Sequence, residues 1–314
     1  MTTSHSNAVV VDRLTRKFKD VTAVEAISFE VAHGELFSLV GPDGAGKTTT
    51  LRMLAGILRP TSGDATILGE SVASDPERVK PHIAYMPQRF GLYSDLTVEE
   101  NIHFYADLFD VPLEDRPRQL DKLYSFSRLG PFKTRLAGNL SGGMKQKLGI
   151  CCAMVHQPDV MLLDEPTFGV DPISRRDLWL IVHQMVEEGT TVIASTAYLD
   201  EAERSDRVAM LNEGRVLTID DPRVLQARLK GYLYEIEPPD PRTLRDALQQ
   251  QDFVKRATLF GTSIHVVVGS PERDRLLLAK ALQEHGLPDE AITDAEPSLE
   301  DVFLNMIEAP ESTT

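Results

Sequence analysis

The chain has 314 residues, of which 42% are hydrophobic and 26% are charged, and its formal net charge at pH 7 is -15. This length exceeds one average domain, and no apolar run approaches the roughly 18 residues that a membrane-spanning helix needs. The sequence therefore predicts more than one domain and no membrane span. Its acidity argues against binding nucleic acid through one large basic face.

The first residues and the cysteines bear on where the chain works. Residues 1–7 are polar and lack both a basic region and an apolar segment, so we expect a flexible tail without a secretory signal. Cys151 and Cys152 are adjacent in an apolar segment. Buried thiols are more common in such a setting than a disulfide or a metal site, and they fit a reducing cytoplasm.

Strand-like segments fill residues 8–40 and lead into a glycine-rich loop. Residues 8–14 and 26–31 alternate in hydrophobicity, which favours antiparallel strands at the edge of a sheet, and residues 36–40 form an apolar run. The loop that follows fits the pattern G-x-x-x-x-G-K-[ST]. It consists of Gly41, Pro42, Asp43, Gly44, Ala45, Gly46, Lys47, Thr48 and Thr49.

The loop lies between a strand and a helix-like segment over residues 47–55, which is the context that phosphate binding requires. Backbone N–H groups at the beginning of a helix point toward an anion, and the helix dipole adds to the attraction. In such a loop Lys47 neutralises the β- and γ-phosphates of a nucleotide, and the hydroxyl of Thr48 binds Mg²⁺. The sequence therefore predicts a nucleoside triphosphate site.

The middle of the chain alternates between helices and strands. Residues 97–156 have a helical pattern interrupted by prolines, and Ser141 can cap the helix that begins within the segment LSGGMKQ. Residues 160–163 are a continuous apolar run, as expected of a parallel strand covered on both faces. A helix follows, and after it a strand over residues 191–195. We therefore expect an α/β fold with ligands at the carboxyl ends of its strands.

Two carboxylates, Asp164 and Glu165, end the apolar strand. Adjacent acids are common by chance, but acids at this place in a chain that also has a phosphate-binding loop are typical of a Walker B pair. We expect Asp164 to hold Mg²⁺ and Glu165 to polarise the water that attacks the γ-phosphate.

Residues 231–308 differ in character from the rest of the chain. Their pattern predicts a strand, a helix, two strands about Gly261, a helix and a strand, which is the arrangement of a small α+β ferredoxin-like domain. A last helix over residues 299–307 follows, and residues 309–314 are expected to be a flexible tail. No catalytic group of residues is recognisable in this region, so we expect an accessory domain for regulation or dimer packing.

The motifs, in this order, resemble those of the nucleotide-binding subunits of ATP-binding cassette (ABC) transporters. The resemblance covers about residues 8–225 and implies a P-loop NTPase of ABC type, with a nucleotide-binding domain over residues 8–230. Such a domain has a parallel-sheet core, an antiparallel edge sheet and a helical subdomain, here at about residues 97–156. In that family the signature motif of one subunit caps the γ-phosphate that its partner binds. The matching residues here are Ser141, Gly142, Gly143 and Gln146.

Other roles also follow from the resemblance. Phe18 matches the aromatic residue that stacks on adenine, with a core phenylalanine as the alternative. Gln88 resembles the Q-loop glutamine, which senses Mg²⁺ and the γ-phosphate, and residues 89–93 lie where a membrane subunit docks. Asp171 resembles the D-loop aspartate that crosses the dimer interface. The implied ligands of ATP-bound Mg²⁺ are Thr48, Gln88 and Asp164, and the implied catalytic residues are Lys47, Gln88 and Glu165.

A narrower resemblance connects the chain to the ATPases of ABC-2-type exporters, notably those for drugs. It is carried by residues 41–43, 85–88, 171–176 and 297–304. It implies ATP hydrolysis that drives efflux of drugs or similar small molecules through separate membrane subunits, on the inner face of the plasma membrane. The implied partner is a second nucleotide-binding subunit, for which we expect a homodimer. The transported substrate is not encoded here, because specificity lies in the membrane subunits.

One position departs from the family pattern. The family places a switch histidine in the turn after the strand that follows the Walker B pair, and Ala197 stands there. A methyl group cannot hydrogen-bond the γ-phosphate or orient the attacking water. We nevertheless expect hydrolysis, because Glu165, Gln88 and the signature motif are intact.

The sequence is compatible with two alternative functions. The first is a soluble ABC protein that remodels ribosomes, but such proteins usually carry two cassettes and a basic linker, and this acidic chain has one phosphate loop. The second is an ATP-sensing clamp that dimerises with little hydrolysis, which Ala197 favours. Co-purification with ribosomes or with membrane proteins separates the first from an exporter, and ATP turnover compared with ATP-driven dimerisation tests the second.

Overall fold

The computed structural model describes residues 7–89, 91–229 and 231–308. The chain separates into two compact units, the first up to residue 222 and the second from residue 223, whereas the predicted boundary is at residue 230. The tails expected at residues 1–6 and 309–314 lie outside the described residues. The prediction that Asn7 belongs to the tail is wrong. Asn7 begins the first strand, and its backbone pairs with that of Ala32.

The first unit contains an antiparallel sheet with the strand order β2-β1-β4-β5. Its strands are β1 (Asn7–Phe18), β2 (Val21–Ala32), β4 (Ser62–Ile67) and β5 (Glu70–Ser71). The first two strands are longer than predicted because they pair along one hairpin that runs from Asn7 and Ala32 to Phe18 and Val21. The prediction of an antiparallel edge sheet is confirmed.

A second sheet of six strands has the order β10-β9-β3-β8-β7-β6. Its strands are β3 (Leu36–Val40), β6 (Ile83–Met86), β7 (Val160–Asp164), β8 (Thr191–Thr196), β9 (Arg207–Asn212) and β10 (Arg215–Asp220). All neighbours pair in parallel except β9 and β10, which are antiparallel. Every residue of β3, β7 and β8 is buried, which explains the apolar runs at residues 160–163 and 192–194.

Side chains that alternate along the parallel strands enter two different cores. Phe37 and Leu162 pack with Leu51 of α1 (Lys47–Leu54) and with the edge sheet. On the opposite face, Leu163 packs with Trp179 of α6 (Pro172–Glu187). The short elements of this unit are α2 (Pro76–Val79), a 3₁₀ helix (Lys80–His82) and α7 (Leu199–Ala202).

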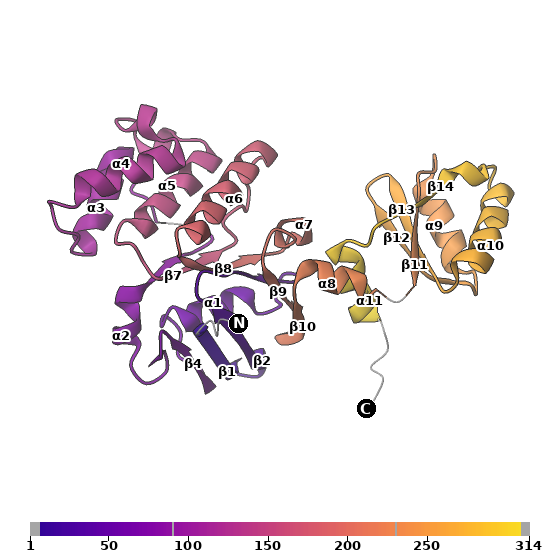
Figure 1. Cartoon of the computed structure of the whole chain (residues 1–314), viewed down its shortest axis with the longest axis horizontal. Helices are drawn as coiled ribbons and strands as arrows, with labels where there is room; N and C mark the ends of the chain where they lie inside the picture. The colour runs from indigo at the N-terminus through magenta and orange to yellow at the C-terminus, as the bar shows by residue number, and fades with distance from the viewer. Residues whose placement is uncertain (1–6, 90, 230, 309–314) are drawn as a thin grey trace, which may run out of the picture. The chain divides into compact units, whose positions relative to one another are not determined.

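Three helices, α3, α4 and α5, form the expected helical subdomain (Figure 1). Their bounds are α3 (Val98–Leu108), α4 (Arg116–Ser127) and α5 (Gly142–Met154), with 3₁₀ helices at Gly130–Phe132 and Ala137–Asn139. Thr97 and Glu100 cap α3 reciprocally, as a capping box requires. Cys151 and Cys152 are buried free thiols in the core of this subdomain, and burial raises the pKa of Cys151 to about 12.

The second unit has the predicted ferredoxin-like topology, with an antiparallel sheet in the order β12-β13-β11-β14. In chain order its elements are α8 (Pro222–Ala227), β11 (Tyr232–Ile236), α9 (Pro241–Gln249), β12 (Val254–Phe260), β13 (Ser263–Val268), α10 (Pro271–Glu284), a 3₁₀ helix (Asp289–Ala291), β14 (Ile292–Asp294) and α11 (Leu299–Glu308). Ile264 and Val266 pack with Leu244 of α9 and Leu278 of α10. Among the described residues no helix has the length and apolarity to cross a membrane.

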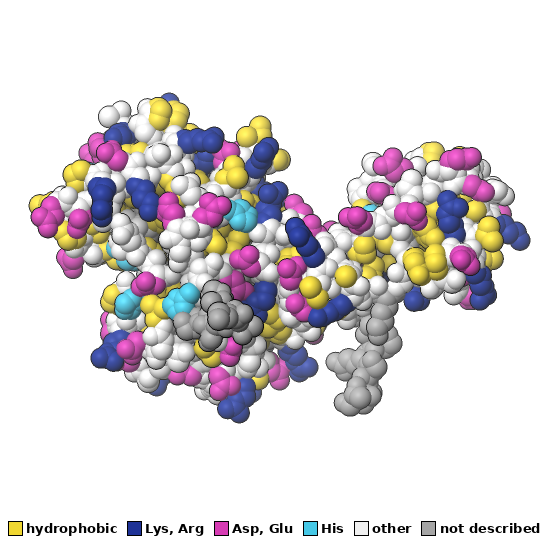
Figure 2. All heavy atoms as spheres, viewed as in Figure 1, with side chains coloured by type: hydrophobic (Ala, Val, Ile, Leu, Met, Phe, Trp, Pro, Cys, Tyr) yellow, Lys and Arg dark blue, Asp and Glu magenta, His cyan; other side chains and the backbone are white. Residues whose placement is uncertain are grey.

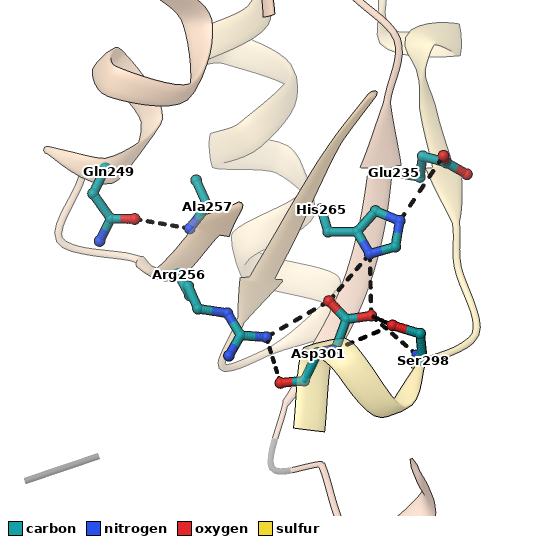
Figure 3. A network of polar contacts seen from close by, with 7 residues as sticks. All are labelled: Glu235, Gln249, Arg256, Ala257, His265, Ser298 and Asp301. Carbon is teal, nitrogen blue, oxygen red and sulfur yellow. Dashed lines mark hydrogen bonds and ion pairs between the residues drawn. The ribbon is translucent and has the colours of Figure 1, made fainter. Parts of the chain in front are cut away.

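The last helix is fixed to the other face of this sheet by a buried carboxylate (Figure 3). Asp301 of α11 has no exposed surface, and both its carboxylate oxygens lie 3.1 Å from Nδ1 of His265, which alternates with Ile264 and Val266 along β13. The hydroxyl of Ser298 donates to the same carboxylate at 2.7 Å. Burial raises the pKa of Asp301, but the hydrogen bonds from His265 and Ser298 outweigh it and hold the pKa below its usual range.

We expect Asp301→Asn to lower the free energy of opening α11 by about 3 kcal/mol, because breaking a buried ionic network leaves its other members without their partner. Hydrogen exchange of the α11 amides measures this loss, and Glu296→Gln, an exposed acid just before the helix, is the control. Because the pKa of Asp301 is lower in the folded state than the value of about 4 in the unfolded state, its ionised carboxylate stabilises the protein above that pH. This stabilisation is lost as the pH falls through the folded-state pKa. Equal protection of α11 in the Asp301 variant and the wild type would contradict the prediction.

Candidate functional site

The glycine-rich loop connects β3 to α1, and its glycines are needed for its backbone path. The φ angles of Gly44 and Gly46 are +83° and +101°, a region that residues with a Cβ atom adopt at a cost. A Cβ atom on Gly46 would lie 2.7 Å from the carbonyl oxygen of Ala23. The loop therefore exposes its backbone where helix α1 begins.

Lys47 is the first residue of α1 and is almost fully buried. Its ammonium group donates to the carbonyl oxygens of Gly41 at 2.7 Å and Pro42 at 3.1 Å. The side chain thus curls back over the loop, which places its charge at the beginning of the helix, where an anion is favoured.

The carboxylate of Asp164, at the end of β7, receives three hydroxyl groups. Thr48 and Ser195 each donate to Oδ1 at 2.8 Å, and Tyr85 donates to Oδ2 at 3.1 Å. Burial and, second, the charge of Asp164 raise the pKa of Tyr85 to about 12, so this phenol keeps its proton at neutral pH. The carboxylate and the Thr48 hydroxyl are the oxygen ligands that Mg²⁺ prefers, and the chemistry of this donor pair therefore fits the metal.

Glu165 is held by two of the residues expected to surround the γ-phosphate. Its Oε1 lies 3.5 Å from the ammonium nitrogen of Lys47, and its Oε2 accepts a hydrogen bond from the amide of Gln88 at 2.9 Å. Its φ angle is +48°, which costs a residue other than glycine about 1–3 kcal/mol. Hydrogen bonds from its backbone N–H to the carbonyl oxygen and hydroxyl of Ser195 hold it there.

Apart from Asp164, which is bound to Thr48, these groups line one cavity of about 290 Å³ at the carboxyl ends of the parallel strands. Its lining residues are Ala23, Asp43, Gly44, Ala45, Gly46, Lys47, Thr48, Thr49, Gln88 and Glu165. The phosphate loop and Glu165 come from β3 and β7, which both pair with β8. The structure therefore brings together the loop, Gln88 and the acidic pair, at the edge where such sheets bind ligands.

The signature residues lie elsewhere on the first unit. Gly142 and Gln146 line a second cavity of about 340 Å³ together with Gln88. The hydroxyl of Ser141 accepts a hydrogen bond from the backbone N–H of Met144 at 3.3 Å and caps α5. This cap leaves Ser141 at the tip of a helix, as the sequence predicted.

The signature motif is packed against the beginning of α6. A Cβ atom on Gly143 would lie 2.4 Å from Cβ of Ser174, so glycine permits this close approach. Asp171 caps the same helix by accepting a hydrogen bond from the backbone N–H of Ser174 at 3.0 Å, and this bond lowers the pKa of Asp171. Gly143 of the expected signature motif and Asp171, the expected D-loop aspartate, are thereby both fixed to Ser174.

Two further predicted positions are exposed. Phe18, at the tip of the β1–β2 hairpin, is 43% exposed, and the guanidinium carbon of Arg16 lies 4.6 Å from its ring centroid. Ala197 follows β8 directly and is also exposed. Phe90, within the expected docking segment, lies outside the described residues.

Sequence reasoning missed several residues of the site. Ser195 and Tyr85 bind Asp164, and Glu201 binds the hydroxyls of Thr167 and Thr196. The position of Ser195 in the last residues of a strand was the one available signal. The others depend on contacts between segments that are distant in sequence.

A parallel sheet that carries a phosphate loop and an acidic pair at one edge, between an antiparallel sheet and a helical layer, defines a P-loop NTPase of the ATP-binding cassette class. The family model described as ABC transporter matches residues 24–168. The Nod factor export ATP-binding protein I of Burkholderia pseudomallei (strain K96243) is 35% identical over 296 residues, which cover 94% of this chain and 95% of that protein. The chain therefore belongs to the ATP-binding proteins of ABC transporters.

Another relative is the probable multidrug ABC transporter ATP-binding protein YbhF of Escherichia coli (strain K12). It is 41% identical over 307 residues, which cover 95% of this chain and 52% of that protein, so the chain spans about half the length of this relative. A solved ATP-binding subunit of an ABC transporter aligns with a TM-score of 0.64 at 30% identity, over 70% of this chain and 92% of that one. A dimeric cassette solved in a post-hydrolysis state with ADP and Pi shares the fold, with a TM-score of 0.61 at 23% identity, over 68% of this chain and 98% of that one.

We expect Gly46→Ala to destabilise the first unit by about 3 kcal/mol, the sum of the backbone strain and the forced shift of Ala23. Gly44→Ala is the matched control, because a Cβ atom there has nothing within 4 Å and only the strain of about 1–2 kcal/mol remains. Urea unfolding followed by the fluorescence of Trp179, the one tryptophan of the sequence, measures both values. Equal losses in the two variants would contradict the role of the close contact.

Proposed function

We propose that the chain binds ATP with Mg²⁺ at the cavity beneath the phosphate loop and hydrolyses it. The observation that carries this proposal is the convergence of Lys47 and Gln88 on Glu165, at 3.5 and 2.9 Å, beside the hydroxyl-bound carboxylate of Asp164. The loop N–H groups and Lys47 hold the β- and γ-phosphates, and Phe18 offers its ring to adenine. Thr48, Asp164 and Gln88 would hold Mg²⁺, which neutralises charge on the phosphates.

In this proposal Glu165 is the general base. It accepts a proton as the oxygen of water forms a bond to the γ-phosphorus, and the bond to the β-phosphate oxygen breaks to release ADP and phosphate. The amide of Gln88 holds Oε2, and Oε1, which lies 3.5 Å from the ammonium nitrogen of Lys47, accepts the proton from water once Lys47 binds the phosphates. Hydrogen bonds from the backbone of Glu165 to Ser195 keep the base at the end of β7.

We further propose that ATP is bound between two copies of the chain. The tip of α5, with Ser141, Gly142, Gly143 and Gln146, is fixed beside the second cavity by its contact with α6, which supports a role in capping the nucleotide of a partner. Asp171, at the beginning of α6, would reach across the same interface. The dimeric solved cassette with ADP and Pi has the same fold.

The transport function is proposed from the relatives and from an exposed aromatic surface. The names of the relatives describe multidrug and Nod factor export. Tyr93 and Phe104 are exposed and in ring contact, with centroids 4.6 Å apart, and Tyr105 lies 5.5 Å from Phe104. Tyr93 of this cluster follows Gln88 by five residues, so the cluster offers a membrane subunit a docking site that can respond to ATP binding.

We therefore propose an ATPase subunit of an ABC-2-type exporter that acts on drugs or similar small molecules. It would lie on the inner face of the plasma membrane, attached through its permease subunits, with residues 231–308 as an accessory domain. Basic and acidic side chains are interspersed over the face seen in Figure 2. The formal net charge of -15 favours a protein partner over the ribosomal RNA of the alternative.

Glu165→Gln is expected to reduce steady-state ATP turnover by at least about 100-fold, because the amide cannot accept the proton from water. Phosphate release by the purified chain measures turnover, and a fluorescent ATP analogue measures binding, which we expect to be retained. Glu187→Gln, an exposed acid on α6, is the control. Unaltered turnover in the Glu165 variant would exclude this residue as the base.

Ala197→His is expected to raise turnover by about tenfold, because an imidazole can hydrogen-bond the γ-phosphate and orient the water. Ala197→Leu adds bulk without a donor and should give no gain. ATP-driven dimerisation is measured in parallel. A wild-type chain that dimerises without releasing phosphate would favour the clamp alternative, and no gain with histidine would show a site adapted to alanine.

A further inference from the structure

Glu201 of α7 is a buried carboxylate that joins two loops of the site. It is 2% exposed, and its Oε2 accepts hydrogen bonds from the hydroxyls of Thr167 at 2.8 Å and Thr196 at 2.9 Å. Both threonines are 1% exposed. A carboxylate removed from water needs such donors, and hydrogen bonds to a charged acceptor are about twice as strong as neutral ones.

The second oxygen of Glu201 binds a third segment. Its Oε1 forms an ion pair with Nε of Arg175, in the first turn of α6, at 3.2 Å. The guanidinium carbon of Arg175 lies 4.2 Å from the ring centroid of Tyr198. The backbone N–H of Tyr198 donates to the hydroxyl of Thr196 at 3.0 Å. The contacts of Arg175 therefore lead back to Thr196, which also binds Glu201.

The three partners of Glu201 belong to three different segments around the site. Thr167 lies two residues after the general base, in the segment that leads to the D-loop. Thr196 precedes Ala197 and follows Ser195, which binds both acids of the pair. Arg175 lies in the helix that Asp171 caps. Because all three segments contact the carboxylate of Glu201, a shift of one segment changes the contacts of the other two.

We propose that Glu201 is a positioning residue that couples the turn at Ala197 to the D-loop, and so sets the placement of Glu165 and Asp171 together. This inference rests on the proposed ATPase activity. Alanine at position 197 has no group that can hydrogen-bond a phosphate, so the turn acts on the site through its neighbours Ser195 and Thr196. The carboxylate of Glu201 fixes that turn relative to the segment that leads to the D-loop.

The test begins with Glu201→Gln, which keeps the shape but replaces one acceptor oxygen by a donor. We expect kcat for ATP to fall about tenfold or more and KM to change less than about twofold, because a small misplacement of the reacting groups affects the chemical step rather than binding. Asp200→Asn, an exposed acid in the same helix, is the matched control. Nucleotide-binding stoichiometry gives the folded fraction, to which kcat is normalised.

The two threonines separate positioning from simple stability. Thr167→Val and Thr196→Val each remove one hydroxyl without changing the shape, and each should lower kcat. Adding either to Glu201→Gln should lower kcat little further, since the partner is already lost. Thr196→Ser restores the hydroxyl and should restore kcat. These variants also decide the matter if Glu201→Gln fails to fold.

Each outcome has a definite meaning. Wild-type kcat and KM in the valine variants or in Glu201→Gln would overturn the coupling role while leaving the ATPase proposal intact. Losses that simply add in the combined variants would also overturn it. A wild-type chain without ATP turnover would instead overturn the proposed function, and the positioning role with it.

Discussion

The buried carboxylate of Asp164 is the point on which the arrangement of the site depends. It receives hydroxyl groups from α1, β6 and β8, and a carboxylate in the interior is tolerated only with such partners. The three hydroxyl groups can reach this carboxylate only if the phosphate loop and the ends of β6 and β8 lie at the same edge of the sheet. The same condition that makes the interior stable therefore aligns the phosphate loop with the strand ends that form the proposed nucleotide site.

The alignment also explains why Glu165 can be strained. Its positive φ turns the side chain away from the strand direction and toward Lys47 and Gln88. A strained residue persists only where its surroundings fix it. Here Ser195 accepts hydrogen bonds from the backbone N–H of Glu165 and donates to Asp164, so one serine serves both acids.

Much of the fold was predictable because its signals are local. The apolar runs of β3 and β7, the glycine pattern of the loop and the alternating strands of the second unit each depend on nearby residues, and each was found. The clustering of the loop with the acidic pair followed from their places at strand ends. The pairing of Asn7 with Ala32, and the resulting length of β1, depends on a partner strand and was missed.

The rest of the site depends on register between segments far apart in the chain. Ser195 lies beside Asp164 because β7 and β8 pair in that register, and no local pattern reports it. Glu201 resembles any acid of a short exposed helix until its two threonine partners are known. The contact of Gly143 with Ser174 likewise joins two helix beginnings that the sequence separates by about thirty residues.

The state of the two cysteines has a practical consequence for spectroscopy of this protein. Both thiols are enclosed in the helical layer, and the high pKa of Cys151 leaves almost no thiolate at neutral pH. Because the thiolate is the reactive form, we expect maleimide dyes to react very slowly with the native chain. A cysteine introduced at a surface position can then carry a single label, and distances between two copies can be followed without first removing the natural sulfur atoms.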